Sequence, residues 1–304
     1  MRPVLTCAVL LLVPSLSFAQ TEEMIEDVQA RLESLKFVAS LHDPESGAFK
    51  ATPTGKPSLR ATSTAARAWK YLGGENLGSK FPEKAKAAAF VMSCYDPKTG
   101  GFADAPGGKP DVMVTAVGVM AAVEFEIPKE KFAKAMDYLK ENAKTFEEVR
   151  LGAAAVEAWG VKDCPFDLKS WFKIADEFGM RKGLPPINGG ARDTGSLVAM
   201  WLRLGREPQS RKGVLIILND GQWATGGWAK AGEKEPDAET TYRVMRAFML
   251  LKENPKDPAK VREFLAKCRN ADGGYGTKPG EASTLGGVYF AAIITRWLND
   301  LEKK

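Results

Sequence analysis

Histidine is almost absent from the sequence, cysteine is rare, and neither sign of charge is in large excess. The 304 residues include one histidine, His42, and four cysteines, with 43 Lys and Arg against 38 Asp and Glu. So little histidine and cysteine leaves few side chains for a zinc centre, which takes three or four ligands of mainly these types. Charges of both signs are interleaved without an arginine-rich stripe, which argues against a nucleic-acid partner.

Long hydrophobic runs are also missing, except at the N-terminus. The first residues, MRPVLTCAVLLLVPSLSFAQ, combine Arg2, an apolar stretch too short to span a bilayer, and small residues before Ala19. This pattern is typical of a secretory signal peptide over residues 1–19, and it predicts export to the periplasm or the extracellular space. The alternatives are a retained anchor or a buried N-terminal helix. No later stretch is long and apolar enough for stable membrane insertion after cleavage.

Cleavage after Ala19 would leave residues 20–304 as a single domain, long enough to bury a large core. Three cysteines then remain, Cys94, Cys164 and Cys268. An odd number of cysteines argues against a disulfide framework, although two of the three can still form one disulfide.

The sequence does contain an internal repeat. FVASLHDPESGAF (37–49) and FVMSCYDPKTGGF (90–102) agree in seven of thirteen columns, at an offset of 53. FLAKCRNADGGY (264–275) is a third copy, and a fourth is taken to end in DGQW (220–223), 52 residues before Tyr275. The chain between them has room for two degenerate units, around 132–160 and 168–204. We therefore expect six units.

Each unit has the pattern of two helices. Before the turn, Val261, Phe264, Leu265 and Cys268 follow helical spacing and form one apolar face. After the turn, TAVGVMAAV (115–123) and YFAAIITRWL (289–298) are apolar around more of the helix. This contrast predicts an outer, half-exposed helix and an inner, buried one in each unit. Period-2 alternation is absent, so we expect an all-α fold.

Adjacent glycines followed by an aromatic residue close the turns. We expect the first glycine to end the outer helix in a left-handed conformation and the second to let the chain reverse closely. The aromatic residues, Phe49, Phe102, Trp223 and Tyr275, would fill the gap between helix ends as packing residues.

Two-helix units of this length with Asp-Gly-Gly-aromatic turns resemble the α/α toroid of prenyltransferase β subunits and squalene and terpene cyclases. DGQW (220–223) is similar to the core of the cyclases' Gln-Trp motif, and Cys268 to Tyr275 resembles a prenyltransferase repeat. The resemblance covers roughly residues 30–300 and implies an (α/α)6 toroid of about six two-helix repeats, two of them degenerate. It also implies a central apolar cavity inside six inner helices, with catalytic groups near their N-terminal ends.

The zinc centre of the prenyltransferases is not matched. The family needs an Asp-x-Cys motif and a later histidine, but Asp111-Val112-Met113 and Asp237-Ala238-Glu239 lack the cysteine, and Gly287 stands near the histidine position. His42 aligns with Tyr95 and is expected at the surface, at the end of an outer helix. We therefore expect no metal site and no cofactor, with zinc only if the site diverges from the family pattern.

The cyclases instead protonate an alkene with an aspartic acid of an Asp-x-Asp-Asp motif, and the matching stretch here is Asp237 to Thr240. Glu239 would be the acid, with Asp237 beside it. The alternative is helix capping, because Asp at an N-cap satisfies free amides. Asp111 and Asp193 precede other inner helices in the same way, which favours capping.

Four aromatic residues, Trp223, Trp228, Tyr242 and Tyr289, are candidates for ligand binding, since aromatic walls bind isoprenoid chains and stabilise cations. Core packing explains them equally well.

Three functions follow. The first is an exported toroid without the zinc centre that binds an apolar, isoprenoid-like small molecule or a protein partner. The second is an active prenyltransferase-like or terpene-cyclase-like enzyme that uses Asp237 and Glu239. The third is a secreted carbohydrate-active α/α-barrel enzyme, which would need a second carboxylate across a cleft.

Overall fold

The computed structural model describes residues 18–182 and 190–303, and nearly all of its regular structure is helical. Two-residue strands β1 (Phe49–Lys50) and β2 (Pro57–Ser58) form one small antiparallel pair, although the sequence pattern predicted no strand. The helices are α1 (Phe18–Ser40), α2 (Leu59–Leu72), α3 (Lys84–Ser93), α4 (Val112–Glu124), α5 (Lys134–Asn142), α6 (Phe146–Trp159), α7 (Lys169–Lys182), α8 (Gly190–Arg203), α9 (Arg211–Asp220), α10 (Ala238–Leu251), α11 (Pro258–Cys268) and α12 (Leu285–Glu302), with 3-10 turns η1 (Lys129–Lys131) and η2 (Val161–Asp163).

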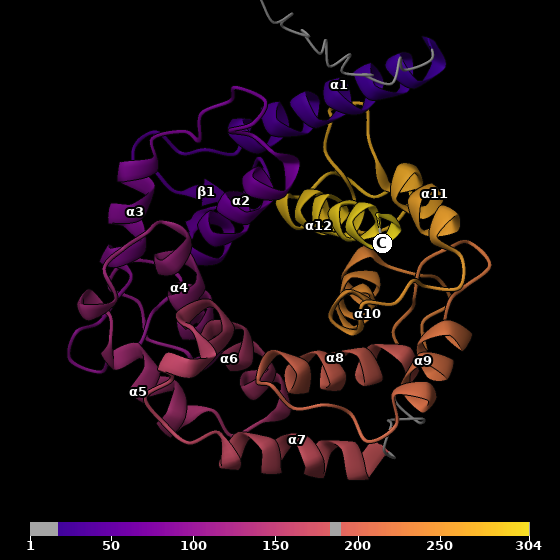
Figure 1. Cartoon of the computed structure of the whole chain (residues 1–304). Helices are drawn as coiled ribbons and strands as arrows, with labels where there is room; N and C mark the ends of the chain where they lie inside the picture. The colour runs from indigo at the N-terminus through magenta and orange to yellow at the C-terminus, as the bar shows by residue number, and fades with distance from the viewer. Residues whose placement is uncertain (1–17, 183–189, 304) are drawn as a thin grey trace, which may run out of the picture.

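The helices form two concentric rings (Figure 1). The even-numbered helices form the inner ring, in which each packs against the next and α12 packs against α2. The odd-numbered helices lie outside them (Figure 1). This is the (α/α)6 toroid that the repeats predicted. The two degenerate units correspond to α5 with α6 and α7 with α8, so both are complete helix pairs despite their weak sequence signal.

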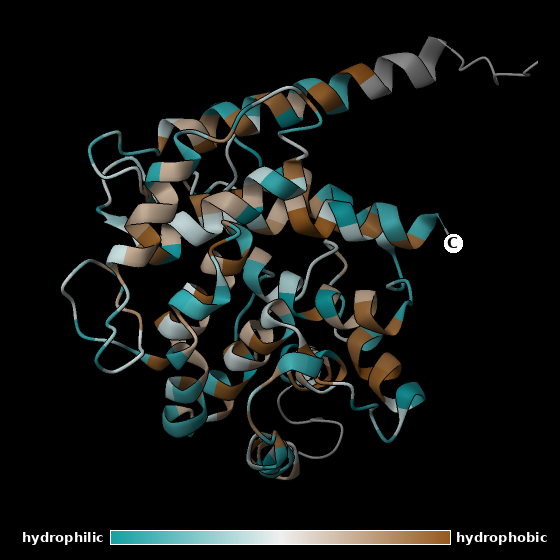
Figure 2. Ribbon diagram, turned by 60° about the vertical axis from the view of Figure 1, so that its left-hand side comes forward, coloured by the Kyte–Doolittle hydropathy of each residue, from teal (hydrophilic) through white to brown (hydrophobic). Residues whose placement is uncertain are grey.

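Inner and outer helices differ in burial as their sequences predicted. In the outer helix α11 four of eleven residues are buried, and they are Val261, Phe264, Leu265 and Cys268. In the inner helix α12 eleven of eighteen residues are buried, because it packs against neighbours on several sides. Figure 2 shows hydrophobic and hydrophilic residues side by side along the helices, as amphipathic packing requires.

The turns between outer and inner helices repeat the same contacts. In three units the residue that caps the inner helix donates its backbone N–H to an aromatic residue nine positions earlier: Asp111 to Phe102, Asp237 to Trp228 and Thr284 to Tyr275. Phe49 pairs with Ser58, the cap of α2, at the same spacing. The backbone N–H groups of Phe49, Phe102 and Trp228 donate to the hydroxyls of Thr62, Thr115 and Thr241, thirteen residues later.

The fourth aromatic of this series is therefore Trp228, and its assignment to Trp223 was wrong. Trp228 is fully buried, whereas the side chain of Trp223 is 38% exposed. The error has a simple cause. DGQW (220–223) is similar in sequence to the turn motif, but it lies five residues before Gly226-Gly227, the pair that forms the turn. The 52-residue spacing between Trp223 and Tyr275 is a coincidence.

The glycines serve the turn and not the helix end. The outer helix α3 ends at Ser93, and its C-cap Cys94 keeps a right-handed conformation. The left-handed glycine, Gly100 with φ 82°, comes six residues later. A Cβ at the next position, Gly101, would lie 2.6 Å from Cβ of Pro110, so only glycine lets the two segments of the turn approach this closely.

One type of backbone contact joins three pairs of neighbouring units, and one of these joints closes the ring. The backbone N–H of the first residue of an inner helix donates to a carbonyl in the turn of the following unit, two residues after the aromatic residue of that turn, which we call the corner aromatic. The bonds run from Leu59 to Asp104 and from Ala238 to Thr277, both 2.8 Å. The last unit makes the same contact with the first, from Leu285 to Ala51 at 2.9 Å. Ring closure thus uses the same geometry as the joints within the chain.

The predicted signal peptide falls mainly on residues 1–17, which lie outside the described residues. Helix α1 begins at Phe18, beside the expected cleavage position after Ala19. Within the described residues, the model contains no helix that combines the length and apolar character of a membrane span.

Candidate functional site

A cavity of about 440 Å³ lies inside the inner ring and is lined by side chains from all six inner helices. The apolar lining is concentrated on two helices: α4 contributes Val117, Met120 and Val123, and α6 contributes Leu151 and Ala154, although Glu124, Arg150 and Glu157 of the same helices also line the cavity. In the closed ring these helices face α10 and α12 across the centre (Figure 1). The facing wall is polar, so the cavity is amphipathic and not the purely apolar space that the resemblance implied.

The polar wall contains a hydrogen-bonded series of four side chains, Arg67, Tyr289, Tyr242 and Arg246, which we call the arginine–tyrosine chain. Arg67 Nη1 donates to the Tyr289 hydroxyl at 3.3 Å, and Tyr289 donates to the Tyr242 hydroxyl at 3.3 Å. Arg246 Nη2 donates to the same Tyr242 hydroxyl at 3.1 Å. The chain runs from α2 across α12 to α10.

Aromatic rings hold both guanidinium groups in place. The Arg67 guanidinium lies 4.7 Å from the ring centre of Tyr289, and that of Arg246 lies 4.4 Å from the ring centre of Trp297. Tyr242 stacks on Trp297, with ring centres 5.5 Å apart. These contacts orient the arginines toward the cavity without neutralising them.

The repeat explains where these residues lie. Arg67 and Arg246 are both the ninth residue after the helix cap, and so are Met120 on α4 and Ala154 on α6. On these four helices, equivalent positions thus contribute two arginines and two apolar side chains to the cavity lining. Tyr242 and Tyr289 are equivalent in the same sense, each being the fifth residue after its cap.

Positive charge exceeds negative charge in the cavity wall. Four of its six cations have carboxylate partners, with Lys70 against Glu124 at 2.9 Å, Arg203 against Glu157 at 3.0 Å, and Arg150 and Arg243 against Glu147 at 2.9 and 3.0 Å. Within the described residues, Arg67 and Arg246 have no carboxylate at ion-pair distance. Nε of Arg246 is buried and has no hydrogen-bond acceptor there. Two guanidinium groups without carboxylate partners in a partly buried wall are costly, and an anionic group beside them relieves that cost.

Tyr242 responds to this charge. Burial alone would raise the pKa of its phenol, but the guanidinium groups of Arg246, Arg203 and Arg67 and the hydrogen bond from Tyr289 lower the pKa below its usual value. Burial raises the pKa of Tyr289, which therefore stays a neutral donor. The phenol of Tyr242 therefore favours its anionic form, and the neighbouring phenol of Tyr289 favours its neutral form.

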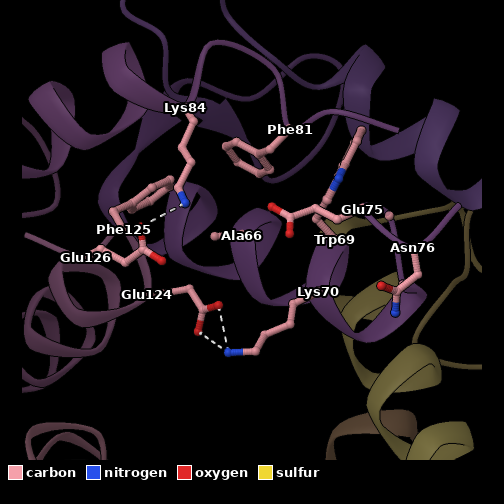
Figure 3. Close-up of a pocket in the computed structure, with 12 residues that line it drawn as sticks. Ala66, Trp69, Lys70, Glu75, Asn76, Phe81, Lys84, Glu124, Phe125 and Glu126 are labelled. Atoms are coloured by element: carbon pink, nitrogen blue, oxygen red, sulfur yellow. Dashed lines mark hydrogen bonds and ion pairs between the residues drawn. The ribbon is translucent and has the colours of Figure 1, made fainter. Parts of the chain in front are cut away.

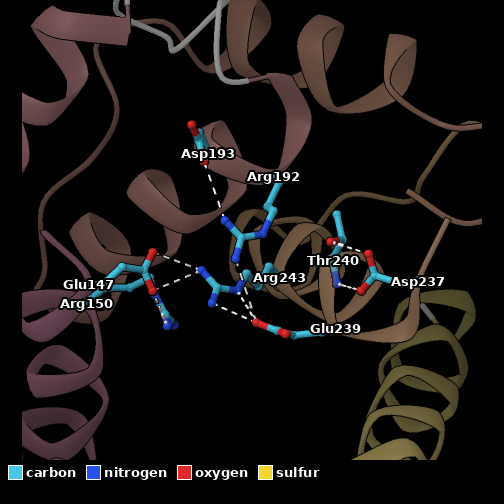
Figure 4. Close-up of polar contacts among 8 residues, drawn as sticks. All are labelled: Glu147, Arg150, Arg192, Asp193, Asp237, Glu239, Thr240 and Arg243. Atoms are coloured by element: carbon cyan, nitrogen blue, oxygen red, sulfur yellow. Dashed lines mark hydrogen bonds and ion pairs between the residues drawn. The ribbon is translucent and has the colours of Figure 1, made fainter. Parts of the chain in front are cut away.

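Charged side chains near the N-terminal ends of the inner helices form a second network (Figure 4). Arg243 of α10 binds Glu147 of α6 at 3.0 Å and Glu239 of its own helix at 2.7 Å. Arg192 of α8 lies 3.8 Å from Glu239. Burial tends to raise the pKa of Glu147, but Arg150 and Arg243 lower it to about 2. The network connects α6, α8 and α10 across this end of the cavity.

The two predicted catalytic carboxylates occupy different environments. Asp237 is the N-cap of α10 and accepts hydrogen bonds from the backbone N–H of Thr240 at 2.8 Å and from its hydroxyl at 2.7 Å. Glu239 lines the cavity, but its side chain is 49% exposed and its carboxylate faces two guanidinium groups. An alkene-protonating acid needs a dry site, and the half-exposed, ion-paired carboxyl group of Glu239 does not have one.

The four predicted ligand-binding aromatics are divided between cavity, core and surface. Tyr242 and Tyr289 line the cavity. Trp228 is buried in its turn, where Nε1 donates to the Leu218 carbonyl at 2.7 Å, and Trp223 is partly exposed in the segment that follows the outer helix α9. Asp111 caps α4 as expected, whereas Asp193 lies within the first turn of α8 and is not its cap.

Sequence reasoning missed the arginines. Arg67 and Arg246 lie on inner helices that carry other charged residues as well, Arg60 and Lys70 on α2 and Glu239 and Arg243 on α10, so charge alone did not distinguish them. Their equal distance from the caps was the available signal.

The residues do not fit a zinc centre of the prenyltransferase kind. Among the described residues, no group of three or more His, Cys, Asp and Glu side chains is arranged to hold a metal ion. At Gly287, near the family's histidine position, even a Cβ would lie 2.0 Å from the Tyr275 carbonyl oxygen. Cys94, Cys164 and Cys268 are free thiols, and burial raises the pKa of Cys94 and of Cys268 to about 12.

His42 is aligned with Tyr95, as expected, but it is not a surface residue. Each lies against the corner aromatic of its unit, with ring centres 5.1 Å apart for His42 and Phe49 and 5.0 Å for Tyr95 and Phe102. The His42 side chain is only 11% exposed, and Nε2 lies 3.5 Å from Glu83. It packs in the turn, away from the central cavity.

Comparison with known proteins agrees with this architecture. The pattern of the prenyltransferase alpha-alpha toroid domain matches residues 69–137 and 193–304, more than half of the chain. A protein from Actinoplanes superposes with a TM-score of 0.60 and 14% identity, over 91% of this chain and 99% of that one. A type II terpene cyclase, MstE from Scytonema, in complex with geranylgeranyl dihydroxybenzoate, also gives 0.60, at 9% identity over 93% and 99%. At such identities these likenesses concern the fold alone. No curated protein sequence gives a significant match.

Proposed function

Because the chain belongs to the prenyltransferase α/α-toroid family, we propose that its central cavity binds an amphiphilic small molecule with an anionic head group and an isoprenoid-like apolar chain. The observation that carries the proposal is the pair Arg67 and Arg246, two guanidinium groups in the cavity wall that lack carboxylate partners among the described residues. Guanidinium groups bind carboxylate and phosphate groups best, because their N–H donors match the oxygens of these anions.

The opposite wall suits the rest of such a molecule. Val117, Met120, Leu151 and Ala154 form an apolar surface on α4 and α6, the helices that face α10 and α12 across the ring. The volume of about 440 Å³ lies within the usual range for small-molecule sites. The ligand of the Scytonema cyclase, geranylgeranyl dihydroxybenzoate, combines a long isoprenoid chain with an aromatic acid, the same combination of features.

This proposal modifies the expectation of an apolar ligand, because with a neutral molecule the Tyr242 phenolate would be the one anionic partner for the two positive charges of Arg67 and Arg246. A protein partner in place of a small molecule has no comparable support from the cavity. A zinc-dependent transfer is not proposed, since the residues do not fit the metal. Export through residues 1–19 stays part of the proposal, and N-terminal sequencing of exported protein should then start at Gln20.

The enzymatic alternatives lack a placed acid. Glu239 and Glu147 are the carboxylates on the two sides of Arg243, and both accept hydrogen bonds from it. A terpene cyclase or an inverting glycosidase needs one protonated carboxyl group. No feature of the site favours proton transfer over binding, so binding is the function we propose.

Calorimetric titration with farnesyl diphosphate and with farnesol tests the proposal. We expect the diphosphate to bind at least tenfold more tightly than the neutral alcohol. Arg246→Gln and Arg67→Gln should each lower the affinity for the diphosphate by tenfold or more, which corresponds to about 1.4 kcal/mol in binding free energy. Arg296→Gln is the matched control, because Arg296 is exposed on α12 and pairs with Asp300. Equal affinity for the two compounds, or unchanged affinity in both cavity variants, would refute an anion site at these arginines.

A further inference from the structure

A second pocket opens beside the ring, at the C-terminal ends of α2 and α4 (Figure 3). Its volume is about 290 Å³. Three aromatic side chains line it, Trp69 from α2, Phe81 from the segment before α3, and Phe125, which follows α4. Charged and polar side chains complete the lining, and they include Glu75, Asn76, Lys84 and Glu126. Phe81 lies between the other two, with ring centres 5.6 Å from Trp69 and 5.7 Å from Phe125. We call this space the side pocket.

The side pocket and the central cavity share a boundary. Lys70 and Glu124 line both spaces, and they face each other as an ion pair with Nζ 2.9 Å from Oε1. The pair joins the last turns of two neighbouring inner helices, as Figure 3 shows. The side chain of Lys70 is 62% exposed and that of Glu124 is 24% exposed, and an ion pair with a solvent-exposed lysine contributes little to stability. A ligand could therefore part them at small cost.

The apolar wall of the cavity leads toward this boundary. Val117, Met120 and Val123 follow one another at intervals of three residues on α4, so they lie along one face of that helix. The next residues are Glu124, at the boundary, and Phe125, inside the side pocket. A chain that follows this stripe away from the arginines reaches the aromatic walls.

On this continuity, and resting on the function proposed above, we infer that the side pocket binds the far end of a long apolar chain whose anionic head lies at Arg67 and Arg246. A short chain fits within the central cavity. A longer chain passes between Lys70 and Glu124 and places its end among Trp69, Phe81 and Phe125. The side pocket therefore determines preference for chain length, and the two spaces together suit a chain of about twenty carbons better than one of ten.

Ala66 offers the means to test this inference, because it lines the side pocket and is absent from the lining of the central cavity. Ala66→Leu should fill part of the side pocket. We expect wild-type protein to bind geranylgeranyl diphosphate at least tenfold more tightly than geranyl diphosphate. In the variant, the C20 compound should lose most of this advantage, while the C10 affinity stays within twofold.

The matched control is Ala292→Leu. Ala292 holds the same position relative to the cap of α12 that Ala66 holds on α2, it is similarly buried at 9% against 7%, and it does not line the side pocket. Binding of both compounds should be unchanged in this control. If Ala66→Leu keeps the full C20 preference, the inference about the side pocket is wrong. If wild-type protein binds neither diphosphate, the proposed function itself fails.

A measurement on the wild-type protein covers the case in which Ala66→Leu does not fold. A geranylgeranyl diphosphate carrying a diazirine at its chain end would be photolysed in the complex, and the labelled residues located by peptide mass spectrometry. We expect label on Phe81, Phe125 or their neighbours. Label confined to residues of the central cavity would overturn the inference.

Discussion

The hydroxyl of Tyr289 donates a hydrogen bond to the hydroxyl of Tyr242 across 3.3 Å, and this contact joins the last two inner helices inside the cavity. It also completes the arginine–tyrosine chain, since each phenol receives a hydrogen bond from one of the two arginines that lack carboxylate partners in the described structure. The contact gives Tyr242 two donors and leaves its own proton without an assigned acceptor. Tyr242 is therefore the residue through which pH should act on the cavity.

We expect Tyr242 to ionise well below its unfolded pKa of 10.0, because three guanidinium groups surround it. A phenol with a lowered pKa binds fewer protons in the folded state between its two pKa values. The free energy of unfolding should therefore rise with pH across that window, by about 1.4 kcal/mol per pH unit at most, and this contribution should be lost as pH falls through the lowered pKa. Urea unfolding at neutral to alkaline pH measures the slope.

Tyr242→Phe should abolish that slope and remove one phenolate from the ultraviolet titration of the folded protein. Tyr95→Phe is the control, because burial raises the pKa of Tyr95. A Tyr242→Phe variant that keeps the early phenolate titration would show that another tyrosine is responsible.

Glu147→Gln should destabilise the ring, because the carboxylate bridges Arg150 on α6 and Arg243 on α10. Its side chain is 44% exposed, so solvent screening limits the expected loss to about 1 kcal/mol in the free energy of unfolding. A lowered carboxyl pKa gives stability above the unfolded value of 4.5 that disappears as pH falls to about 2. Acid unfolding in this range, compared with the exposed Glu177→Gln, measures the contribution. Equal acid sensitivity in wild type and Glu147→Gln would contradict it.

Two adjacent glycines in α12 should respond oppositely to alanine. A Cβ at Gly287 would lie 2.0 Å from the Tyr275 carbonyl oxygen, so Gly287→Ala should cost roughly 1–3 kcal/mol or more. At Gly286 the nearest atoms are 3.8 Å away, and Gly286→Ala should stabilise the helix by roughly 0.5–1 kcal/mol. Chemical denaturation of the pair provides the comparison. Similar free energies of unfolding for the two variants would mean that the backbone at Tyr275 moves to accommodate the new Cβ at position 287.

Thr241→Val keeps the side-chain shape but removes the hydroxyl that accepts the backbone N–H of Trp228 at 3.1 Å. That N–H is buried, and leaving it without a partner should lower the free energy of unfolding by roughly 1–3 kcal/mol. Thr295→Val, on a partly buried position of α12, serves as the control. A loss no larger than that of the control would show that another acceptor replaces Thr241.

The sequence was sufficient to predict the architecture because the repeated motifs occur at fixed spacings along the chain. The 53-residue offset between Phe49 and Phe102 relates two turns with the same spacing, because each aromatic residue lies nine residues before the cap of its inner helix. It failed locally at Trp223, because the Gln-Trp pair at 222–223 resembles the cyclase motif and lies 52 residues before Tyr275. The adjacent glycines of Gly226-Gly227-Trp228 were the sequence signal for the true turn, and the burial of Trp228 and its hydrogen bonds with Thr241 and Asp237 confirm it.

The site was less predictable because its parts are distant in the chain. Tyr242 and Tyr289 were identified as aromatic candidates, but Arg67 lies 179 residues before Arg246, and only closure of the ring brings α2 beside α12. Sequence patterns place a charged residue on a helix face, yet they do not reveal which charges from different helices lack counterions. That property depends on the whole ring.

The backbone contact from Leu285 to Ala51 gives the toroid the same joint between its last and first units as between units that follow each other in sequence. An open solenoid has terminal repeats that fray and need polar caps. In this ring every unit has two neighbours, so there is no end from which unfolding would begin. We therefore expect the protein to unfold in a single cooperative step, and to tolerate new chain termini at any of its loops better than the loss of one unit.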